Sequence, residues 1–144
     1  MDSTSLDESL ALAARIGAKL KGGEVIELIS DLGGGKTAFV KGIAQGAGSS
    51  DIVSSPSFTL TNQYQAGLKT IHHFDFYRLN EPGILKDEIA EIISDRQNVT
   101  IIEWADLISD TLPDERLRIE IRVTGETSRN FKISCPDSLG YLID

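Results

Sequence analysis

Residues 25–48 read VIELISDLGGGKTAFVKGIAQGAG, in which a short apolar run, a glycine-rich segment and an amphipathic stretch follow one another. The apolar run Val25–Ile29 suits a buried strand. Apolar side chains recur at helical spacing after the glycines, which predicts a helix over 36–47. A strand, a glycine loop and a helix in this order are typical of a phosphate-binding loop. The segment therefore predicts an α/β fold of the P-loop type.

The loop departs from the usual P-loop motif at one position. That motif is Gly, four arbitrary residues, then Gly-Lys-Ser/Thr, and Ser30 stands where its first glycine belongs. If the backbone there must be left-handed, serine costs about 1 to 2 kcal/mol more than glycine, whereas an extended backbone costs little. That penalty is small beside nucleotide binding, so the sequence predicts a weakened motif that still functions.

The remaining loop residues each have a role in binding phosphate. Backbone N–H groups of Gly33, Gly34, Gly35 and Lys36 can point at a phosphate, and the helix N-terminus adds partial positive charge. The Lys36 ammonium would reach the β and γ phosphates, and the Thr37 hydroxyl would bind Mg²⁺. The alternative is a glycine-rich turn that ends in an exposed lysine, and the strand before it and the helix after it argue against that alternative.

Glu103 is the first candidate for the second protein group at the metal. It follows the apolar run 99–102, and a carboxylate at the end of such a strand lies at the ligand edge of an open α/β sheet. A P-loop needs a carboxylate of this kind beside its Mg²⁺. The alternative is an ordinary surface glutamate at a strand end.

Asp75 is the second candidate acid. The segment 70–79 alternates His73, Asp75 and Tyr77 with three other side chains, as a strand with two chemically different faces would. Asp75 could hold a water on Mg²⁺ or orient the attacking water. A salt bridge from Asp75 to Arg78 is an equally good explanation on the pattern alone.

The other elements complete a layered fold. Ser5 and Glu8 have capping-box spacing before a helix over 5–20, and Asn80 can cap a helix over 81–95. A possible strand lies in 58–64 and another over 99–104, and the runs 117–123 and 131–135 alternate as a hairpin. Without repeats or a linker, the sequence predicts one domain over 1–144, a P-loop NTPase-like three-layer fold with a mixed β-sheet and a C-terminal β-hairpin.

Composition limits the classes of partner and compartment. The 144 residues carry a formal net charge of −8, which disfavours strong unaided binding of nucleic acid and remains compatible with a basic protein partner. The single cysteine, Cys135, suits a reducing compartment, so a cytoplasmic location is expected. No apolar run approaches the ~20 residues that span a bilayer, so no membrane association is expected. His72 and His73 would point to opposite strand faces, so no zinc site is expected.

Four segments together resemble the bacterial TsaE (YjeE) family, the small ATPases of tRNA threonylcarbamoyladenosine biosynthesis. They are SDLGGGKTAFVKGIAQG (30–46), SPSFTLTNQY (55–64), HFDFYRLNEP (73–82) and IIEWAD (101–106). The resemblance runs over 6–133. It implies a Mg²⁺-dependent ATPase that works with a TsaD and TsaB-like protein complex, which attaches threonylcarbamoyl to adenosine 37 of tRNA. The resemblance implies that tRNA is contacted only through that complex.

The resemblance also assigns roles to residues of this chain. It implies that Lys36 and Thr37 hold phosphate and Mg²⁺ and that Glu103 is the second residue of the metal site, and it places Asp75 in a second switch-like segment. Together with the residue pattern, this makes Lys36, Asp75 and Glu103 the catalytic candidates, with metal binding by Thr37 and Glu103. Ser57 occupies a switch-like loop where the family usually has threonine, and it keeps the hydroxyl. The implied nucleotide-binding residues are Ser9, Gly33, Gly34, Gly35, Lys36, Thr37, Ala38, Ser57, Trp104 and Arg129.

Two other functions stay open at this point. A small-molecule P-loop kinase would need an acceptor pocket and usually an arginine-rich lid, and no such insertion is visible. A nucleotide-dependent scaffold would bind ATP without hydrolysing it. No strong arginine finger is apparent apart from Arg78, so the isolated chain is expected to turn over slowly, and a partner residue is expected to increase the rate.

Overall fold

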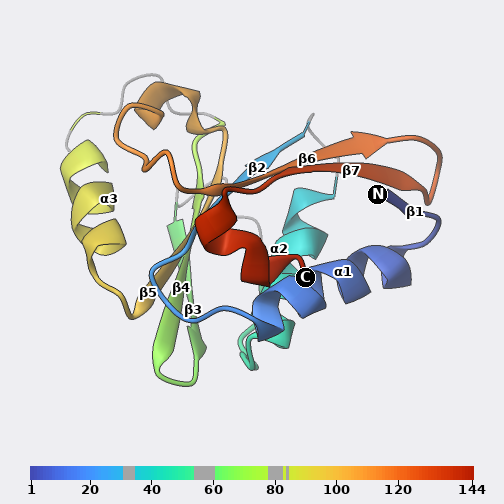
Figure 1. Cartoon of the computed structure of the whole chain (residues 1–144), viewed down its shortest axis with the longest axis horizontal. Coiled ribbons are helices and arrows are strands. Elements are labelled where there is room, and N and C mark those ends of the chain that lie inside the picture. Colours follow the sequence, from blue (N-terminus) through green and yellow to red (C-terminus); the bar gives the residue numbers. More distant parts are fainter. Residues whose placement is uncertain (31–34, 54–60, 78–82, 84) are drawn as a thin grey trace.

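The computed structural model describes residues 1–30, 35–53, 61–77, 83 and 85–144. Figure 1 shows the helices and strands along the chain. They are β1 (Asp2–Ser3), α1 (Leu6–Ala18), β2 (Val25–Ile29), α2 (Lys36–Gly46), β3 (Thr61–Ala66), β4 (Lys69–Asp75), α3 (Leu85–Ser94), β5 (Asn98–Glu103), β6 (Leu117–Val123) and β7 (Arg129–Ser134), with two 3-10 helices, η1 (Ala105–Ile108) and η2 (Asp137–Leu142).

The seven strands form one mixed sheet in the order β1-β7-β6-β2-β5-β4-β3. The pairs β2–β5, β2–β6 and β4–β5 are parallel, while β3–β4, β6–β7 and β1–β7 are antiparallel. The predicted α/β fold with a mixed sheet and a β6–β7 hairpin is confirmed. The parallel strands β2, β4 and β5 place their carboxyl ends at one edge, which is where ligands bind in sheets of this kind.

Helices cover both faces of this sheet (Figure 1). Val99 and Ile101 belong to a core cluster that includes residues of α1, α2 and η2, and Ile102 belongs to a second cluster with residues of α3 and η1. Consecutive strand residues therefore point into different cores, as the pleat requires. The predominantly apolar character of β2 and β5 follows from burial on both sides.

The first helix starts as predicted, with one difference at its cap. Ser5 is the N-cap, and its Oγ accepts a hydrogen bond from the Glu8 backbone N–H at 3.1 Å. The Glu8 carboxylate accepts from the backbone N–H of Thr4 at 2.7 Å, one residue before the position that a reciprocal capping box uses. The helix ends at Ala18, slightly before the predicted end at residue 20.

Helices α1 and α2 pack at backbone contact, and glycines make this possible. A Cβ on Gly17 would lie 2.0 Å from the carbonyl oxygen of Ile43, and one on Gly46 would lie 2.1 Å from that of Ala14. Both distances are far below any tolerated contact, so the missing side chains set the separation of the two helices. Through this packing α1 fixes α2, whose first residue is Lys36.

Two further predicted boundaries are wrong, at the end of β4 and at the start of α3. β4 ends at Asp75 and does not reach residue 79. β5 ends at its carboxylate, Glu103, as expected, and Trp104 after it adopts a left-handed backbone with φ 57°. The third helix begins at Leu85; its predicted cap Asn80 lies outside the described residues. The short strand β1 was not predicted, because two residues carry no periodic pattern. The predicted strand in 58–64 corresponds to β3, and 58–60 lie outside the described residues.

Within the part of the chain that the structure describes, no helix has the length and apolar character to cross a membrane. The expectation of a single domain over 1–144 stays a prediction.

Candidate functional site

Lys36 begins α2 at the ligand edge of the sheet, and its side chain is only 7% exposed. Its Nζ donates to the carbonyl oxygen of Ser30 at 3.1 Å. The same ammonium lies 4.0 Å from Glu103 Oε1 and 4.9 Å from the centre of the Trp104 ring. The lysine therefore joins the end of β2 to the end of β5, and its charge is held at the point where the two strands and α2 meet.

The backbone at Ser30 does not carry the predicted penalty. Trp104 is the only non-glycine residue with positive φ among those described, so Ser30 is not left-handed. Its carbonyl instead accepts the hydrogen bond from Lys36. Serine at this position is therefore compatible with the loop backbone where the structure describes it.

Gly35 gives the start of α2 its unusual geometry. It is the N-cap with φ 95° and ψ 19°, a left-handed backbone that glycine adopts without steric cost. Its carbonyl accepts from the Phe39 N–H at 3.0 Å, which begins the helical hydrogen bonding. Thr37 follows in the first turn and is half-buried. The predicted loop residues Gly33 and Gly34, and Ser57, lie outside the described residues.

Two carboxylates lie next to one another at the carboxyl ends of β4 and β5. Asp75 and Glu103 are direct partners in the parallel register, and they are 6% and 3% exposed. Asp75 Oδ1 accepts from the backbone N–H of Tyr77 at 3.0 Å, and Glu103 Oε2 lies 2.5 Å from His73 Nε2. The predicted trio Lys36, Asp75 and Glu103 thus lies at one sheet edge.

Trp104 lies between a core cluster and the buried Lys36 ammonium. It packs partly against the core cluster on the α3 face, and its ring also lies against the Lys36 ammonium. The Tyr77 ring contacts it at 5.0 Å between centroids, tilted by 50°. A non-glycine residue in left-handed backbone is a strained feature that is enriched at functional sites. This turn of the backbone follows the end of β5 at Glu103 and places the indole beside the Lys36 ammonium.

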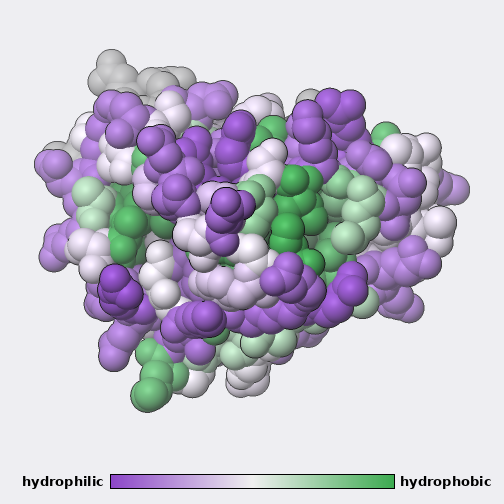
Figure 2. Space-filling model, in the orientation of Figure 1, coloured by the Kyte–Doolittle hydropathy of each residue, from purple (hydrophilic) through white to green (hydrophobic). Residues whose placement is uncertain are grey.

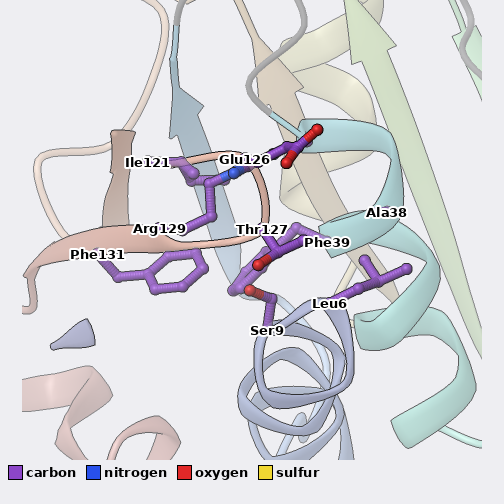
Figure 3. Close-up of a pocket in the computed structure, with 10 residues that line it drawn as sticks. Leu6, Ser9, Ala38, Phe39, Ile121, Glu126, Thr127, Arg129 and Phe131 are labelled. Atoms are coloured by element: carbon purple, nitrogen blue, oxygen red, sulfur yellow. The ribbon is translucent and has the colours of Figure 1, made fainter. Parts of the chain in front are cut away.

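An apolar cavity of about 280 Å³ lies beside the start of α2 (Figure 3). Figure 3 shows side chains from three parts of the fold around it: Ser9 from α1, Phe39 from α2, and Arg129 and Phe131 from β7. The full lining is Leu6, Ser9, Gly35, Ala38, Phe39, Ile121, Glu126, Thr127, Arg129 and Phe131. Four predicted binding residues, Ser9, Gly35, Ala38 and Arg129, are thus brought together around one space.

The polar groups of the cavity are held by local hydrogen bonds. Ser9 Oγ is 2.8 Å from Ser3 Oγ, and Arg129 donates to the carbonyl oxygens of Gly125 and Ser128 at 3.2 and 2.8 Å. Arg129 Nε lies 3.8 Å from the place where a Cβ on Gly35 would be. The guanidinium is therefore fixed next to the N-terminus of α2 by the β6–β7 turn.

A second cleft of about 500 Å³ at the opposite end of β2 has a different character. Its buried acid, Glu24, accepts hydrogen bonds from the backbone N–H groups of Lys21 and Gly22, both at 2.7 Å, and from the Tyr141 hydroxyl at 2.6 Å. Burial, together with Glu24, raises the pKa of Tyr141. These bonds join η2 to the turn before β2, so we assign Glu24 a structural role.

The sequence did not identify every residue of the candidate site. His73 was noted only as a neighbour of Asp75, yet it is the partner of Glu103. The alternation of His73 and Asp75 on one strand face was the available signal. The apolar lining from Phe39, Ile121 and Phe131 has the periodicity of ordinary core residues, so no local pattern could have marked it.

Comparison with known proteins agrees with this architecture. The family description "Threonylcarbamoyl adenosine biosynthesis protein TsaE" matches residues 3–131. The tRNA threonylcarbamoyladenosine biosynthesis protein TsaE of Bacillus subtilis is 40% identical over 127 residues, covering 85% of this chain and 77% of that protein. The protein of the same name from Treponema pallidum is 33% identical over 132 residues, covering 92% and 97%.

A solved structure matches the whole fold. The crystal structure of Bacillus subtilis YdiB superposes with a TM-score of 0.80 at 34% sequence identity, covering 99% of this chain and 88% of that one. The family match spans the loop, both carboxylates and the whole lining of the cavity. The chain belongs to the TsaE family.

Proposed function

We propose that this chain is a Mg²⁺-dependent ATPase of tRNA threonylcarbamoyladenosine biosynthesis that acts with TsaD and TsaB-like partner proteins. The observation that carries the proposal is the placement of Lys36, Asp75 and Glu103 at one sheet edge, with Gly35, the residue before Lys36, in the lining of the apolar cavity. The biosynthetic assignment comes from the names of the relatives.

The cavity is suited to the nucleobase. It is lined mainly by apolar side chains, with the Ser9 hydroxyl and the Arg129 guanidinium as its fixed polar groups. A flat, partly polar base fits a space of this composition. The cavity adjoins Gly35, so a nucleotide whose base lies there would extend its phosphates toward the start of α2, where the N–H groups and the helix dipole favour negative charge.

The donor set fits Mg²⁺. Glu103 and the Thr37 hydroxyl offer hard oxygen ligands, and Mg²⁺ is usually bound through one or two protein oxygens, with phosphate oxygens and water supplying the rest. Among the described residues no group of three or more His, Cys, Asp or Glu could hold a metal by itself, which agrees with a cation that arrives with the nucleotide. When bound, Mg²⁺ would neutralise charge on the β and γ phosphates.

Side chains of this protein would stabilise the phosphate charge, orient the attacking water and exclude bulk water. Lys36 would exchange its bond to the Ser30 carbonyl for the phosphates and offset their developing charge. Asp75, at the adjacent strand end, would orient the attacking water. Trp104 and Tyr77 would cover the lysine and limit access of bulk water.

Replacing Glu103 by alanine tests the role of this carboxylate. We expect hydrolysis to fall by more than the about 10- to 100-fold that follows the loss of a group supporting a metal ligand. Nucleotide binding should be largely retained, because the phosphates are held by the loop and Lys36. Phosphate release and calorimetric titration with ADP would measure the two effects separately. Asp110→Ala, which removes an exposed carboxylate paired with Lys86, is the control. Normal hydrolysis in Glu103→Ala would transfer the metal role to Asp75.

The proposed function as a whole is tested by comparing phosphate release with and without the partner proteins. We expect slow phosphate release by the chain alone and a clear increase when the TsaD and TsaB-like proteins are added, because a partner residue can stabilise the transition state in trans. Equal rates with and without the partners would contradict the proposal. Complex formation that follows ATP binding and persists when hydrolysis is blocked would indicate a scaffold, and phosphoryl transfer to a small acceptor would indicate a kinase.

A further inference from the structure

His73 is the most enclosed polar side chain of the sheet edge. It lies on β4 with no exposed surface, on the face that carries α1 and α2. Its Nε2 is 2.5 Å from Glu103 Oε2, and its Nδ1 is 3.4 Å from the hydroxyl of Tyr64, itself 3% exposed. Both ring nitrogens therefore face a specific partner, which fixes the orientation of the imidazole.

This contact divides the two oxygens of Glu103 between different neighbours. Oε2 faces His73, and Oε1 is 4.0 Å from the Lys36 ammonium. The terminal torsion of a glutamate is broad, so the carboxylate has no strong orientation of its own. Without the bond from His73, it could rotate and move into closer contact with Lys36, away from a cation at the loop.

Each contact from Tyr64 through His73 to Glu103 can pair a hydrogen-bond donor with an acceptor. An ionised carboxylate only accepts hydrogen bonds, so the Nε2 of His73 must donate to Glu103. The Tyr64 hydroxyl can either donate to Nδ1 or accept from it, so the arrangement does not depend on the charge of the ring. The Tyr64 and His73 rings are 6.2 Å apart, and β3 pairs with β4 in a register that keeps the two side chains together.

We propose that His73 is a positioning residue for Glu103, supported by Tyr64. By binding Oε2, it holds Oε1 at the sheet edge, 4.0 Å from the Lys36 ammonium, and keeps the carboxylate from closing onto the lysine. Groups that hydrogen-bond a metal-binding side chain orient it, and their loss typically costs about 10- to 100-fold in metal affinity or activity. The inference rests on the proposed function, because it assumes that Glu103 acts on a bound divalent cation.

The test compares two replacements of His73. Glutamine places its amide nitrogen as many bonds from Cβ as the imidazole Nε2, so His73→Gln can still donate to Glu103. Asparagine is one bond shorter, so His73→Asn cannot reach it. The measurements are Mn²⁺ affinity of the protein–ADP complex by electron paramagnetic resonance, ADP affinity without metal by calorimetry, and kcat and KM for ATP from phosphate release.

We expect His73→Asn to lower both Mn²⁺ affinity and kcat about 10- to 100-fold. Metal-free ADP affinity and KM should stay unchanged, and His73→Gln should restore most of the loss. His72→Asn is the matched control, because His72 lies on the opposite face and bonds Asn98 at 3.0 Å; its Mn²⁺ affinity should equal that of the wild type. A purely structural role for His73 would lower thermal stability without the selective loss of Mn²⁺ affinity, and would overturn the proposal.

Tyr64→Phe keeps the inference testable if His73→Asn does not fold. It removes the hydroxyl and keeps the ring, and we expect a smaller loss of Mn²⁺ affinity in the same direction, whereas Tyr141→Phe at the other end of β2 should show none. Unchanged Mn²⁺ affinity in Tyr64→Phe would then overturn the proposal. If wild type binds Mn²⁺ with ADP and His73→Asn binds it equally well, only this inference fails; if wild type binds neither, the proposed function fails with it.

Discussion

Replacing Lys36 by alanine is expected to remove both nucleotide binding and hydrolysis. The side chain is buried, and its ammonium lies against the Ser30 carbonyl, the Glu103 carboxylate and the Trp104 ring. Its loss removes the lysine charge beside Glu103, so that two buried carboxylates, Asp75 and Glu103, would repel the phosphates. Truncating one partner of a buried charged pair costs about 2 to 5 kcal/mol, which is roughly 30- to 4,000-fold in affinity. Calorimetric titration with Mg·ATP and phosphate release would measure the two losses.

Lys41→Ala is the matched control for this experiment. Lys41 belongs to the same helix and is exposed, so its removal should leave ATP affinity and turnover unchanged. Lys36→Arg separates charge from shape, because a guanidinium keeps the positive charge but presents a planar, rigid fork of donors in place of a compact ammonium. Wild-type ATP affinity in Lys36→Ala would show that the phosphates bind elsewhere, and the proposed site would be wrong.

Adding a methyl group at Gly17 or Gly46 is expected to destabilise the fold, although alanine is the better helix former. Helix propensity alone would favour alanine over glycine by about 1 kcal/mol. The new Cβ would lie 2.0 Å from Ile43 O at position 17 and 2.1 Å from Ala14 O at position 46, and neither backbone atom can rotate away. Overpacking costs about 1 to 3 kcal/mol, so we expect a net loss in the free energy of unfolding from each replacement.

Urea unfolding of both single variants and of the double variant would measure the effect. The two methyl groups would force apart the same helix pair, so the double variant should lose less than the sum of the single losses. Gly140→Ala is the control, because a Cβ there meets nothing within 4 Å and the residue does not have positive φ. Additive losses would mean that each site relaxes independently, and a stability gain at Gly46 would show that α2 shifts without cost.

Strong local sequence patterns were sufficient to predict several helices and strands. The apolar run of β2, the helical spacing of α2 and the Ser5 cap of α1 were predicted close to their observed bounds, because each is fixed by neighbours in the chain. The backbone directly after β5 was not predicted. Trp104 adopts a left-handed conformation there, which the residue type does not predict.

The sequence by itself determined the α/β class, the glycine loop and the identity of Lys36, Asp75 and Glu103 as candidates, since periodicity and motif spacing are local properties. Only the tertiary structure decided how these residues meet. It paired β4 with β5 so that Asp75 and Glu103 are neighbours, placed His73 against Glu103, and closed the cavity with the β6–β7 turn beside α1. Strand order and helix packing join segments that are far apart in the chain, and no local pattern contains that information.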